Sequence, residues 1–316
     1  MIEPALHVVF GAGPLGQTVA RQVLGDGGRV RLVSRSGRVA LPPAPGLAAM
    51  AADAADPAAT RAACAGAAVV HHCIGLPYDQ WAAACAPNMR GLIEGAASAG
   101  ATLVYGDNVY AYGAVTGPIH EALPETAHTV KGRVRAEVAA MLRDAHRAGR
   151  LSAVIVRGSD FFGPGVTDAS MLGSRVFGRL LAGKPAQVVG NPDLPHSYTY
   201  LPDFARAMVL AASRDDAAGR TWHVPNAPPL TTRQIVRQIA AILGVAARVS
   251  PLPGAMVSLL GLFNAQLREL KEMLYEFDAP FVVDSTAFER AFGVTATPFE
   301  TSLAATVAWY RERRAG

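Results

Sequence analysis

The stretch GAGPLG, residues 11–16, constrains the fold more than any other part of the chain. It directly follows an apolar, strand-like segment, residues 5–10, and it opens a helix-like segment, residues 14–27. In such a turn the first glycine permits a tight bend, the second lets the backbone approach a pyrophosphate, and the third allows close packing of helix on strand. The helix N-terminus then offers N–H groups and a positive dipole end to the phosphates. The expected phosphate cradle consists of Gly11, Gly13, Pro14, Leu15 and Gly16.

Short apolar segments alternate with helix-like segments through the first half of the chain. The expected strands are residues 5–10, 29–34, 68–74, 102–106 and 152–158, and the expected helices are residues 14–27, 87–99 and 130–148. Such alternation is typical of right-handed crossovers and a parallel sheet. The strands are apolar almost throughout, as expected when helices cover both faces. The first half therefore predicts an α/β fold with a doubly wound parallel sheet.

The composition excludes several classes of protein. Of 316 residues 51% are hydrophobic and 17% are charged, so a sizeable core can be buried. The formal net charge of +4 is too small and too scattered to imply nucleic acid. The longest apolar stretch, residues 254–263, is too short to span a membrane, and the N-terminus does not resemble a signal peptide. We expect a cytoplasmic protein that acts on a small molecule.

Cysteine and histidine usage gives no indication of a metal site. Cys64, Cys73 and Cys85 contain no C-x-x-C pair, which argues against a disulfide framework or a zinc site and suits a reducing compartment. His71 and His72 have no partners at ligand spacing, so buried histidines are expected there rather than metal ligands.

The end of the second expected strand bears on the choice of nucleotide. NAD-specific sites usually place Asp or Glu there to bind the ribose 2′-hydroxyl, whereas this chain has RLVSRSGR, without an acid. Hydroxyls and guanidinium groups would suit a 2′-phosphate, so NADP(H) is favoured over NAD(H). The alternative is that the arginines are ordinary loop charges. The residues concerned are Ser34, Arg35, Ser36 and Arg38.

An ordered series of further motifs resembles the extended short-chain dehydrogenase/reductases, in particular the NAD-dependent epimerase/dehydratase family. The series comprises ADAADP around Asp53, HHCIG with Cys73 and Gly75, APNMRGLIEGA with Asn88, VRGSDFFGPG (156–165), HSYTYLPDFARAM (196–208) and GRTWHVPNAPPLTTRQI (219–235). The resemblance implies that Asp53, Cys73, Gly75 and Asn88 lie near the cofactor. It also implies that residues 219–235 form a strand of the substrate lobe followed by a helix.

The same resemblance implies two domains. Residues 1–165 would form a Rossmann domain, and residues 166–316 would be mostly a substrate-binding lobe, with about 187–225 partly returning to the Rossmann domain. Helices are expected in this second half at 202–213, 231–243, 255–276 and 299–313.

The resemblance breaks down at the residues that would do the chemistry. The family carries Tyr-x-x-x-Lys where this chain has Lys131-x-x-x-Arg135, and Asn108 stands at its catalytic Ser position. Atypical reductases similar to the isoflavone and phenylpropenoid reductases also carry Lys-x-x-x-Arg, with the Lys as their proposed acid–base group. By this resemblance Lys131 would handle the proton beside the cofactor, Arg135 would hold ribose hydroxyls or phosphate, and Asn108 would hydrogen-bond a substrate oxygen.

Other residues are candidates for supporting roles. Asp107 is a possible general base, with the capping of a loop turn as the alternative. Tyr110 could reach the pocket, either for catalysis or to bind substrate. Asp160, His196 and Tyr200 are expected substrate contacts, because their segments face the substrate in the family.

The leading functional hypothesis is an NADP-dependent oxidoreductase that acts on a small-molecule carbonyl, alcohol or activated double bond. One alternative is an NAD(P)-dependent epimerase or dehydratase with transient redox chemistry. Another is a nucleotide-binding sensor or scaffold without catalysis, because the whole triad is substituted. The Ala-rich helices at 87–99 and 133–148 would suit close packing between two copies, which makes a homodimer a hypothesis to test.

Overall fold

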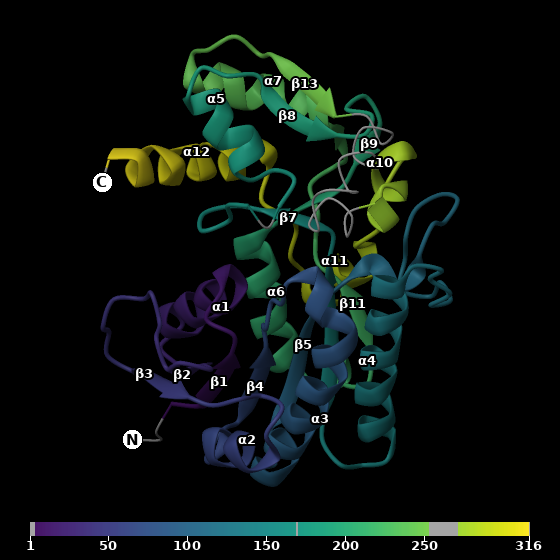
Figure 1. Ribbon diagram of the computed structural model, residues 1–316. Coiled ribbons are helices and arrows are strands. Elements are labelled where there is room, and N and C mark those ends of the chain that lie inside the picture. The colour runs from purple at the N-terminus through teal and green to yellow at the C-terminus, as the bar shows by residue number, and fades with distance from the viewer. Residues whose placement is uncertain (1–3, 169, 253–270, 316) are drawn as a thin grey trace. The chain divides into compact units, whose positions relative to one another are not determined.

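The structure is a computed structural model that describes residues 4–168, 170–252 and 271–315 (Figure 1). The chain divides into two compact units. The first, here called the sheet unit, comprises Met1–Ala111, Glu125–Gly158 and Phe204–Val224. The second unit comprises Tyr112–Pro124, Ser159–Asp203 and Pro225–Gly316. The stretch that returns to the sheet unit thus begins at Phe204, and residues 112–124 from the first half belong to the second unit.

The sheet unit is built on seven strands in the order β11-β6-β5-β4-β1-β2-β3, with every neighbouring pair parallel. Their bounds are β1 Leu6–Phe10, β2 Arg29–Ser34, β3 Leu47–Ala51, β4 Val69–His72, β5 Thr102–Asn108, β6 Ala153–Gly158 and β11 Thr221–His223. This order confirms the predicted doubly wound parallel sheet. β11 was expected in the substrate lobe. That expectation was wrong, because Thr221–His223 extends the central sheet beside β6.

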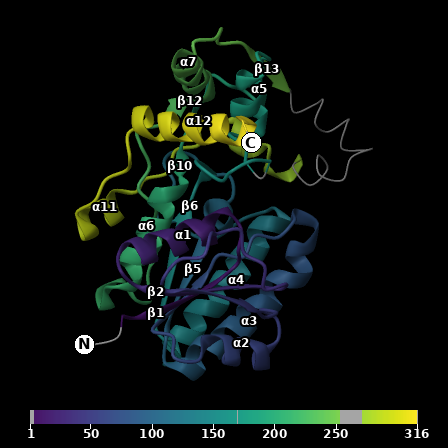
Figure 2. The same ribbon diagram turned by 90° about the vertical axis from the view of Figure 1, so that its left-hand side faces the viewer.

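Helices cover both faces of this sheet, with α1 and α6 on one side and α2, α3 and α4 on the other (Figure 2). Their bounds are α1 Pro14–Gly25, α2 Pro57–Cys64, α3 Trp81–Ala99, α4 Val130–Arg147 and α6 Leu201–Ala212. The central strands are sealed from water, and Val9, Val70 and Leu103 are fully buried. Burial of each such side chain stabilises the fold by about 1.5–3 kcal/mol, so the apolar sequence of these strands follows from their position.

Three local features of the sheet unit differ from the sequence expectation. Leu47–Ala51 forms the edge strand β3, although it contains no β-branched residue, because it pairs along its whole length with β2. Helix α2 follows directly, and Asp56 caps it by accepting from the N–H groups of Ala58 and Ala59. Helix α3 begins at Trp81 rather than at residue 87, with Pro87 inside it. The Trp81 indole donates to the carbonyl of Leu76 at 2.9 Å, and this contact fixes the earlier start.

The second unit combines short strand pairs with helices around its own core. Its strands are β7 Asp160–Phe162, β8 Ala186–Val189, β9 Pro195–His196, β10 Tyr198–Tyr200, β12 Leu230–Thr231 and β13 Val249–Leu252, and its helices include α5 Arg179–Leu181, α7 Thr232–Leu243, α10 Tyr275–Asp278, α11 Thr286–Phe292 and α12 Phe299–Ala315. The strands pair as β7 with β10, β9 with β12 and β8 with β13. Phe177, Ile239 and Val307 lie fully buried in its core. Most of the helix expected at 255–276 lies outside the described residues.

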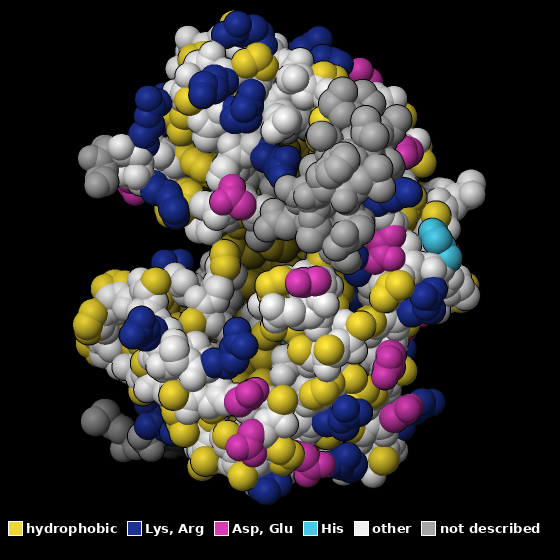
Figure 3. Space-filling view, in the orientation of Figure 1, with side chains coloured by type: hydrophobic (Ala, Val, Ile, Leu, Met, Phe, Trp, Pro, Cys, Tyr) yellow, Lys and Arg dark blue, Asp and Glu magenta, His cyan; other side chains and the backbone are white. Residues whose placement is uncertain are grey.

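The surface of the described residues is mixed in character, and the cysteines are buried. No helix in the described part of the chain is long and apolar enough to cross a membrane, and no metal-binding group of His, Cys, Asp or Glu is found there. The three cysteines are buried, and burial raises the pKa of Cys64 to about 12. On the visible face of the sheet unit, small apolar side chains alternate with scattered charges (Figure 3). Among the described residues only Val130 and Val245 are exposed large hydrophobics, and the homodimer stays a prediction.

A buried histidine pair lies in the sheet itself. His7 on β1 and His71 on β4 stack with ring centroids 5.3 Å apart, and His7 Nδ1 lies 3.0 Å from His71 Nε2. Burial, together with the neighbouring His7, lowers the pKa of His71 well below its ordinary value. Burial and the charge of Arg135 lower the pKa of His72 to about 3. His71 and His72 are therefore neutral in the folded protein at neutral pH.

These histidines should make the fold sensitive to acid. A histidine that stays neutral in the folded protein becomes protonated in the unfolded chain when the pH falls below its unfolded pKa of about 6.5. Protonation then favours the unfolded chain and lowers the stability of the fold. The free energy of unfolding should drop by up to about 1.4 kcal/mol per pH unit for each such histidine. In urea titrations at several pH values, His71→Leu should reduce this slope, and His120→Gln at an exposed site should not. An unchanged slope in His71→Leu would contradict the assignment.

Candidate functional site

The expected nucleotide-binding residues gather at one edge of the sheet unit. The glycine motif follows β1, Ser34 ends β2, Asp53 follows β3, and Cys73 and Gly75 follow β4. Because the strands are parallel, their carboxyl ends all lie at this edge. The chain moves from β1 to β2 on one side and later places β4 on the other side of β1. Such a switch point is where open α/β sheets bind ligands.

The glycine cradle has the geometry that phosphate binding requires. A Cβ at Gly11, where φ is +108°, would lie 2.4 Å from the carbonyl oxygen of Cys73, and a Cβ at Gly16 would lie 1.8 Å from that of Gly11. Both positions therefore exclude any side chain. A Cβ at Gly13, in contrast, would meet no atom within 4 Å. Helix α1 has Pro14 in its first turn, no side-chain cap and no acidic residue there. Its positive end is thus available to an anion.

The segment after β2 is organised by its own hydrogen bonds. Ser34 Oγ donates to the carbonyl of Arg38 at 3.0 Å, and the N–H of Arg38 donates to Ser36 Oγ at 3.3 Å. The side chains of Arg35 and Arg38 are exposed. Asp53, after β3, is also exposed and accepts from the N–H of Ala55 at 2.9 Å, so its carboxylate stabilises a local turn.

The start of α4 places Lys131 beside the turn that follows β5. Thr129 caps the helix by accepting from the N–H of Gly132 at 3.0 Å. A Cβ at Gly132 would lie 2.6 Å from the carbonyl oxygen of Tyr110, so the absence of a side chain lets α4 pack directly on this backbone. Lys131 is only 2% exposed. Its Nζ lies 4.9 Å from the ring centroid of Tyr78, which comes from the loop after β4.

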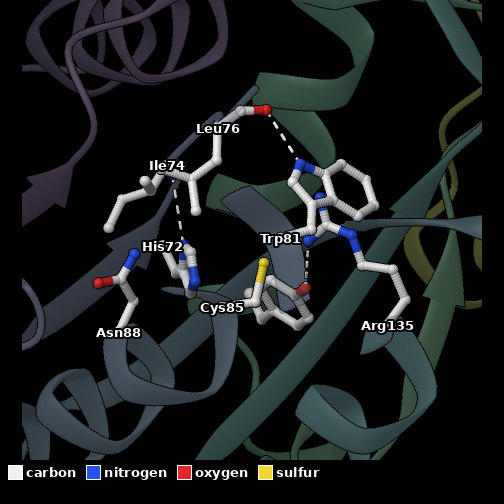
Figure 4. A pocket seen from close by; sticks show the side chains of 8 residues that line it. His72, Ile74, Leu76, Trp81, Cys85, Asn88 and Arg135 are labelled. Atoms are coloured by element: carbon white, nitrogen blue, oxygen red, sulfur yellow. Dashed lines mark hydrogen bonds between the residues drawn. The ribbon is translucent and has the colours of Figure 1, made fainter. Parts of the chain in front are cut away.

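Arg135, one helical turn further along α4, is held by aromatic rings. Its guanidinium group lies over the ring of Trp81, 3.9 Å from the centroid, and donates to the hydroxyl of Tyr105. Figure 4 shows Trp81 and Arg135 together, with the indole hydrogen-bonded to Leu76. A cation on a Trp face is stabilised by about 1–2 kcal/mol when partly desolvated. This contact gives Arg135 a structural partner that the sequence did not reveal.

A small cavity lies next to this cation–ring contact. Its volume of about 10 Å³ admits no more than about one water. It is lined by His72, Ile74, Leu76, Trp81, Cys85, Asn88, Tyr105 and Arg135. The cavity is therefore a gap in the packing, and Asn88 contributes to its wall.

Charged groups of alternating sign extend from Arg135 into the sheet. Asp107 on β5 lies 3.7 Å from Arg135 Nη1 and 2.9 Å from Arg157 Nε on β6. Arg157 also pairs with Glu125 at 2.8 Å, and Glu125 accepts two bonds from Arg143. Although burial alone would raise it, the pKa of Glu125 is lowered by the hydrogen bond and charge of Arg143 and by Arg157.

This arrangement corrects the expectation for Asp107. The residue was expected either as a general base or as the cap of a loop turn. It belongs instead to strand β5, is buried, and faces two guanidinium groups. Its carboxylate therefore neutralises Arg135 and Arg157, and the interpretation as a loop cap was wrong.

Asn108 and Tyr110 shape the turn after β5. Asn108 Oδ1 accepts from the N–H of Tyr110 at 3.1 Å, which directs the oxygen of the amide toward the backbone. The Tyr110 hydroxyl lies 2.9 Å from the Tyr78 hydroxyl. The structure thus brings Asn108, Tyr110 and Lys131 together in the sheet unit, and adds Tyr78 to them.

The expected substrate contacts Asp160, His196 and Tyr200 belong to the second unit. His196 Nε2 lies 2.9 Å from Asp160 Oδ2, and its ring is stacked on Phe277 and Phe281 with centroids 5.1 and 5.0 Å away. His196 is only 4% exposed, so most of its ring is engaged in packing. Tyr200 is partly buried and packs on Phe162 with ring centroids 5.5 Å apart. Their role in substrate binding stays a prediction.

Several residues of these sites were missed in the sequence. Tyr78 and Trp81 lie in a segment that carries no family motif, and only their aromatic character beside the fourth strand could have pointed to them. Glu276 is buried in the second unit, and burial together with the charge of Asp160 raises its pKa well above the ordinary value. No spacing in the sequence connects Glu276 with Asp160.

Comparison with protein families identifies the group to which the chain belongs. The model of the NAD-dependent epimerase/dehydratase family matches residues 7–224, more than half of the chain. The chain therefore belongs to this family of enzymes, and the resemblance that the sequence motifs indicated is confirmed. Among curated proteins, no significant match to the sequence was found.

Solved structures share the fold over almost the whole chain. A dTDP-glucose 4,6-dehydratase from Streptomyces venezuelae, solved with NAD, is 20% identical with a TM-score of 0.79, covering 98% of each chain. A UDP-glucuronic acid 4-epimerase from Bacillus cereus in complex with NAD is 15% identical with a TM-score of 0.79, covering 98% of this chain and 99% of that one. A UDP-glucose 4-epimerase from Thermotoga maritima with UDP-glucose is 16% identical with a TM-score of 0.81 and the same coverage. At these identities the likeness shows the fold.

The charges around Asp107 should be essential for stability. Asp107→Asn leaves Arg135 and the fully buried Arg157 without their shared carboxylate. Removing one partner of a buried ion pair typically costs about 3–5 kcal/mol, and we expect a loss of this size in urea unfolding. Asp216→Asn, which removes an exposed partner of Arg214, is the matched control and should not change stability measurably. A loss below about 1 kcal/mol in Asp107→Asn would argue against the pairing.

Proposed function

We propose that this protein binds a nicotinamide dinucleotide at the carboxyl edge of the sheet and transforms a small molecule by an epimerase- or dehydratase-type reaction. When bound, the cofactor would supply a hydride acceptor and donor, so that the substrate would lose a hydride and regain one within the same catalytic cycle. Lys131 belongs to the group of residues to which we assign proton transfer at the substrate oxygen. The burial of Lys131 beside the Asn108–Tyr110 turn, in the unit that carries the open glycine cradle, is the observation that supports this function most.

The residues at the sheet edge fit the proposed cofactor. The open space at Gly13 and the uncapped start of α1 suit a pyrophosphate, because an anion is stabilised by N–H groups and by the helix dipole there. The segment after β2 would hold the adenosine ribose. Arg135 is less suited to holding a ribose than the sequence indicated, because Trp81, Tyr105 and Asp107 already engage its guanidinium group.

Family membership favours this reaction type over the NADP-dependent reductase that was the leading hypothesis. The three similar solved structures described above are one dehydratase and two epimerases, and the dehydratase and one epimerase were determined with NAD. Those proteins are named for or solved with dTDP-glucose, UDP-glucuronic acid and UDP-glucose, so nucleotide sugars are the first class to screen. The substrate would then carry a secondary alcohol, which supplies both the hydride and the proton.

A net NADP-dependent reduction or oxidation is the second candidate. The observation in its favour is the exposed pair Arg35 and Arg38 after β2, where no acidic side chain is present to bind a ribose 2′-hydroxyl. Guanidinium groups at this place would instead pair with a 2′-phosphate. The two candidates use the same cradle and the same Lys131, and they differ in the nucleotide bound and in whether it is consumed.

Nucleotide titrations of the purified protein should decide between these candidates. Quenching of protein fluorescence by NAD(H) with retained affinity in Arg35→Ala would support the epimerase- or dehydratase-type reaction. A preference for NADPH that Arg35→Ala weakens by about tenfold or more, as expected for a lost charge-assisted bond, would support net redox chemistry. Arg233→Ala, in the second unit, is the matched control. Failure of every nucleotide to bind would overturn the proposed function.

Loss of the Lys131 ammonium should stop turnover without releasing the cofactor. General acid–base groups typically contribute about 10²–10⁴-fold to rate, so Lys131→Met should lower kcat by at least about a hundredfold. Lys184→Met at an exposed site of the second unit should leave kcat unchanged. Substrates are screened as nucleotide sugars by product analysis, and cofactor affinity is measured in parallel. Full turnover in Lys131→Met would remove this residue from the mechanism.

A further inference from the structure

Two tyrosine hydroxyls meet beside Lys131, although the family's tyrosine is absent from α4. Tyr78 begins a short 3-10 helix, Tyr78–Gln80, after β4, and Tyr110 lies in a second one, Val109–Tyr112, after β5. Their hydroxyl oxygens are 2.9 Å apart, which is a hydrogen bond in which either oxygen can donate. Nothing in the Tyr-x-x-x-Lys spacing could indicate this pair, because it is assembled from two separate loops.

Trp81 fixes the orientation of both rings. It contacts Tyr78 edge-on, with centroids 5.0 Å apart and planes at 85°, and it stacks near Tyr110 at 6.1 Å and 28°. Trp81 is itself held by its bond to Leu76 and by Arg135. The N–H of Tyr110 is bonded to Asn108. The hydroxyl pair therefore lies on a rigid support of the kind that a proton-transfer group needs.

Lys131 supplies a positive charge to this pair. Its Nζ lies 4.9 Å from the centre of the Tyr78 ring. A cation at this distance favours the ionised form of a phenol over the neutral form. Lys131 and Tyr110 are 2% and 8% exposed, whereas Tyr78 is partly exposed. Of the three residues, Tyr78 is thus the most exposed and the one that we expect a substrate to reach.

We propose that the Tyr78 hydroxyl is the proton-transferring group of the site, with Tyr110 as its hydrogen-bond partner and Lys131 as the cation that stabilises its phenolate. This inference rests on the proposed function. In the oxidative half of the cycle, the Tyr78 phenolate takes the proton of a substrate hydroxyl. The O–H bond breaks and the C=O bond forms as the carbon gives its hydride to the cofactor. In an epimerase-type cycle both transfers reverse in the reductive half, so the phenol returns its proton to the substrate oxygen and the phenolate is restored.

The ionisation of Tyr78 can be measured without cofactor or substrate. In a titration of the cofactor-free protein followed at 295 nm, we expect one of the eight tyrosines to ionise well below the ordinary value of about 10. Tyr78→Phe should abolish this early step, and Lys131→Met should shift it upward by about one pH unit or more. Tyr310→Phe, which removes a buried hydroxyl bonded to Val166 in the second unit, should leave the step in place. Absence of an early step, or its persistence in Tyr78→Phe, overturns the inference.

Measurements of turnover in single variants distinguish this inference from the proposed function. Tyr78→Phe retains the ring and its packing on Trp81, so cofactor affinity should stay within about threefold while kcat falls by about 10²-fold or more. Tyr110→Phe should give a smaller loss of kcat and a shifted pH–rate profile. If Lys131→Met loses turnover and Tyr78→Phe keeps it, Lys131 transfers the proton itself, and only this inference fails. If the wild-type protein binds no nucleotide, the proposed function fails, and the 295 nm titration still decides whether Tyr78 is ionised early.

Discussion

The pairing of Asp107 with Arg135 and Arg157 is the interaction on which the arrangement of the sheet edge depends. It joins β5, β6 and α4 through groups that are almost completely removed from water. Buried charges of this kind are costly unless each is compensated, so none of the three can change alone. The ion pairs continue from Arg157 to Glu125 and from Glu125 to Arg143, which lies on the half-buried surface of α4. Helix α4 is therefore held in place by charge as well as by apolar packing.

This constraint separates the roles of two residues that are one helical turn apart. The guanidinium group of Arg135 contacts the Trp81 ring and Asp107, and it helps to hold α4 against the sheet. Lys131 lies over the Tyr78 ring, next to the hydroxyl pair. The Lys-x-x-x-Arg spacing alone suggests two equivalent cations at the cofactor. Of these two cations we place only Lys131 in the group of residues proposed to handle a proton, because ring stacking and an ion pair already engage Arg135.

The sequence predicted those features that depend on local pattern. The glycine motif, the alternation of strands and helices, and the bounds of α4 and α6 follow from the residues themselves, with errors of one or two positions. β3 and the start of α3 could not be predicted, because pairing with β2 and the Trp81–Leu76 bond determine them. Asp107 was misplaced for the same reason, since Arg157 is fifty positions away in the chain. Tyr78 belongs to no sequence motif, and only its contacts with Tyr110 and Lys131 make it a candidate site residue.

The positions of the phenol and the ammonium group suggest how the triad could be substituted without loss of chemistry. In the family that the chain resembles, α4 carries a tyrosine and, one turn later, a lysine. Here α4 carries the lysine at the tyrosine position, and a loop after β4 brings a phenol to it. The two functional groups are then both present, with the lysine at the tyrosine position of α4 and the phenol supplied by a loop outside this helix. A phenol on a loop must be held in place, and Trp81 contacts both tyrosines and Arg135 at once. The substituted motif and the aromatic cluster thus meet at one place in the structure, where Lys131 lies over the Tyr78 ring and Trp81 packs against it.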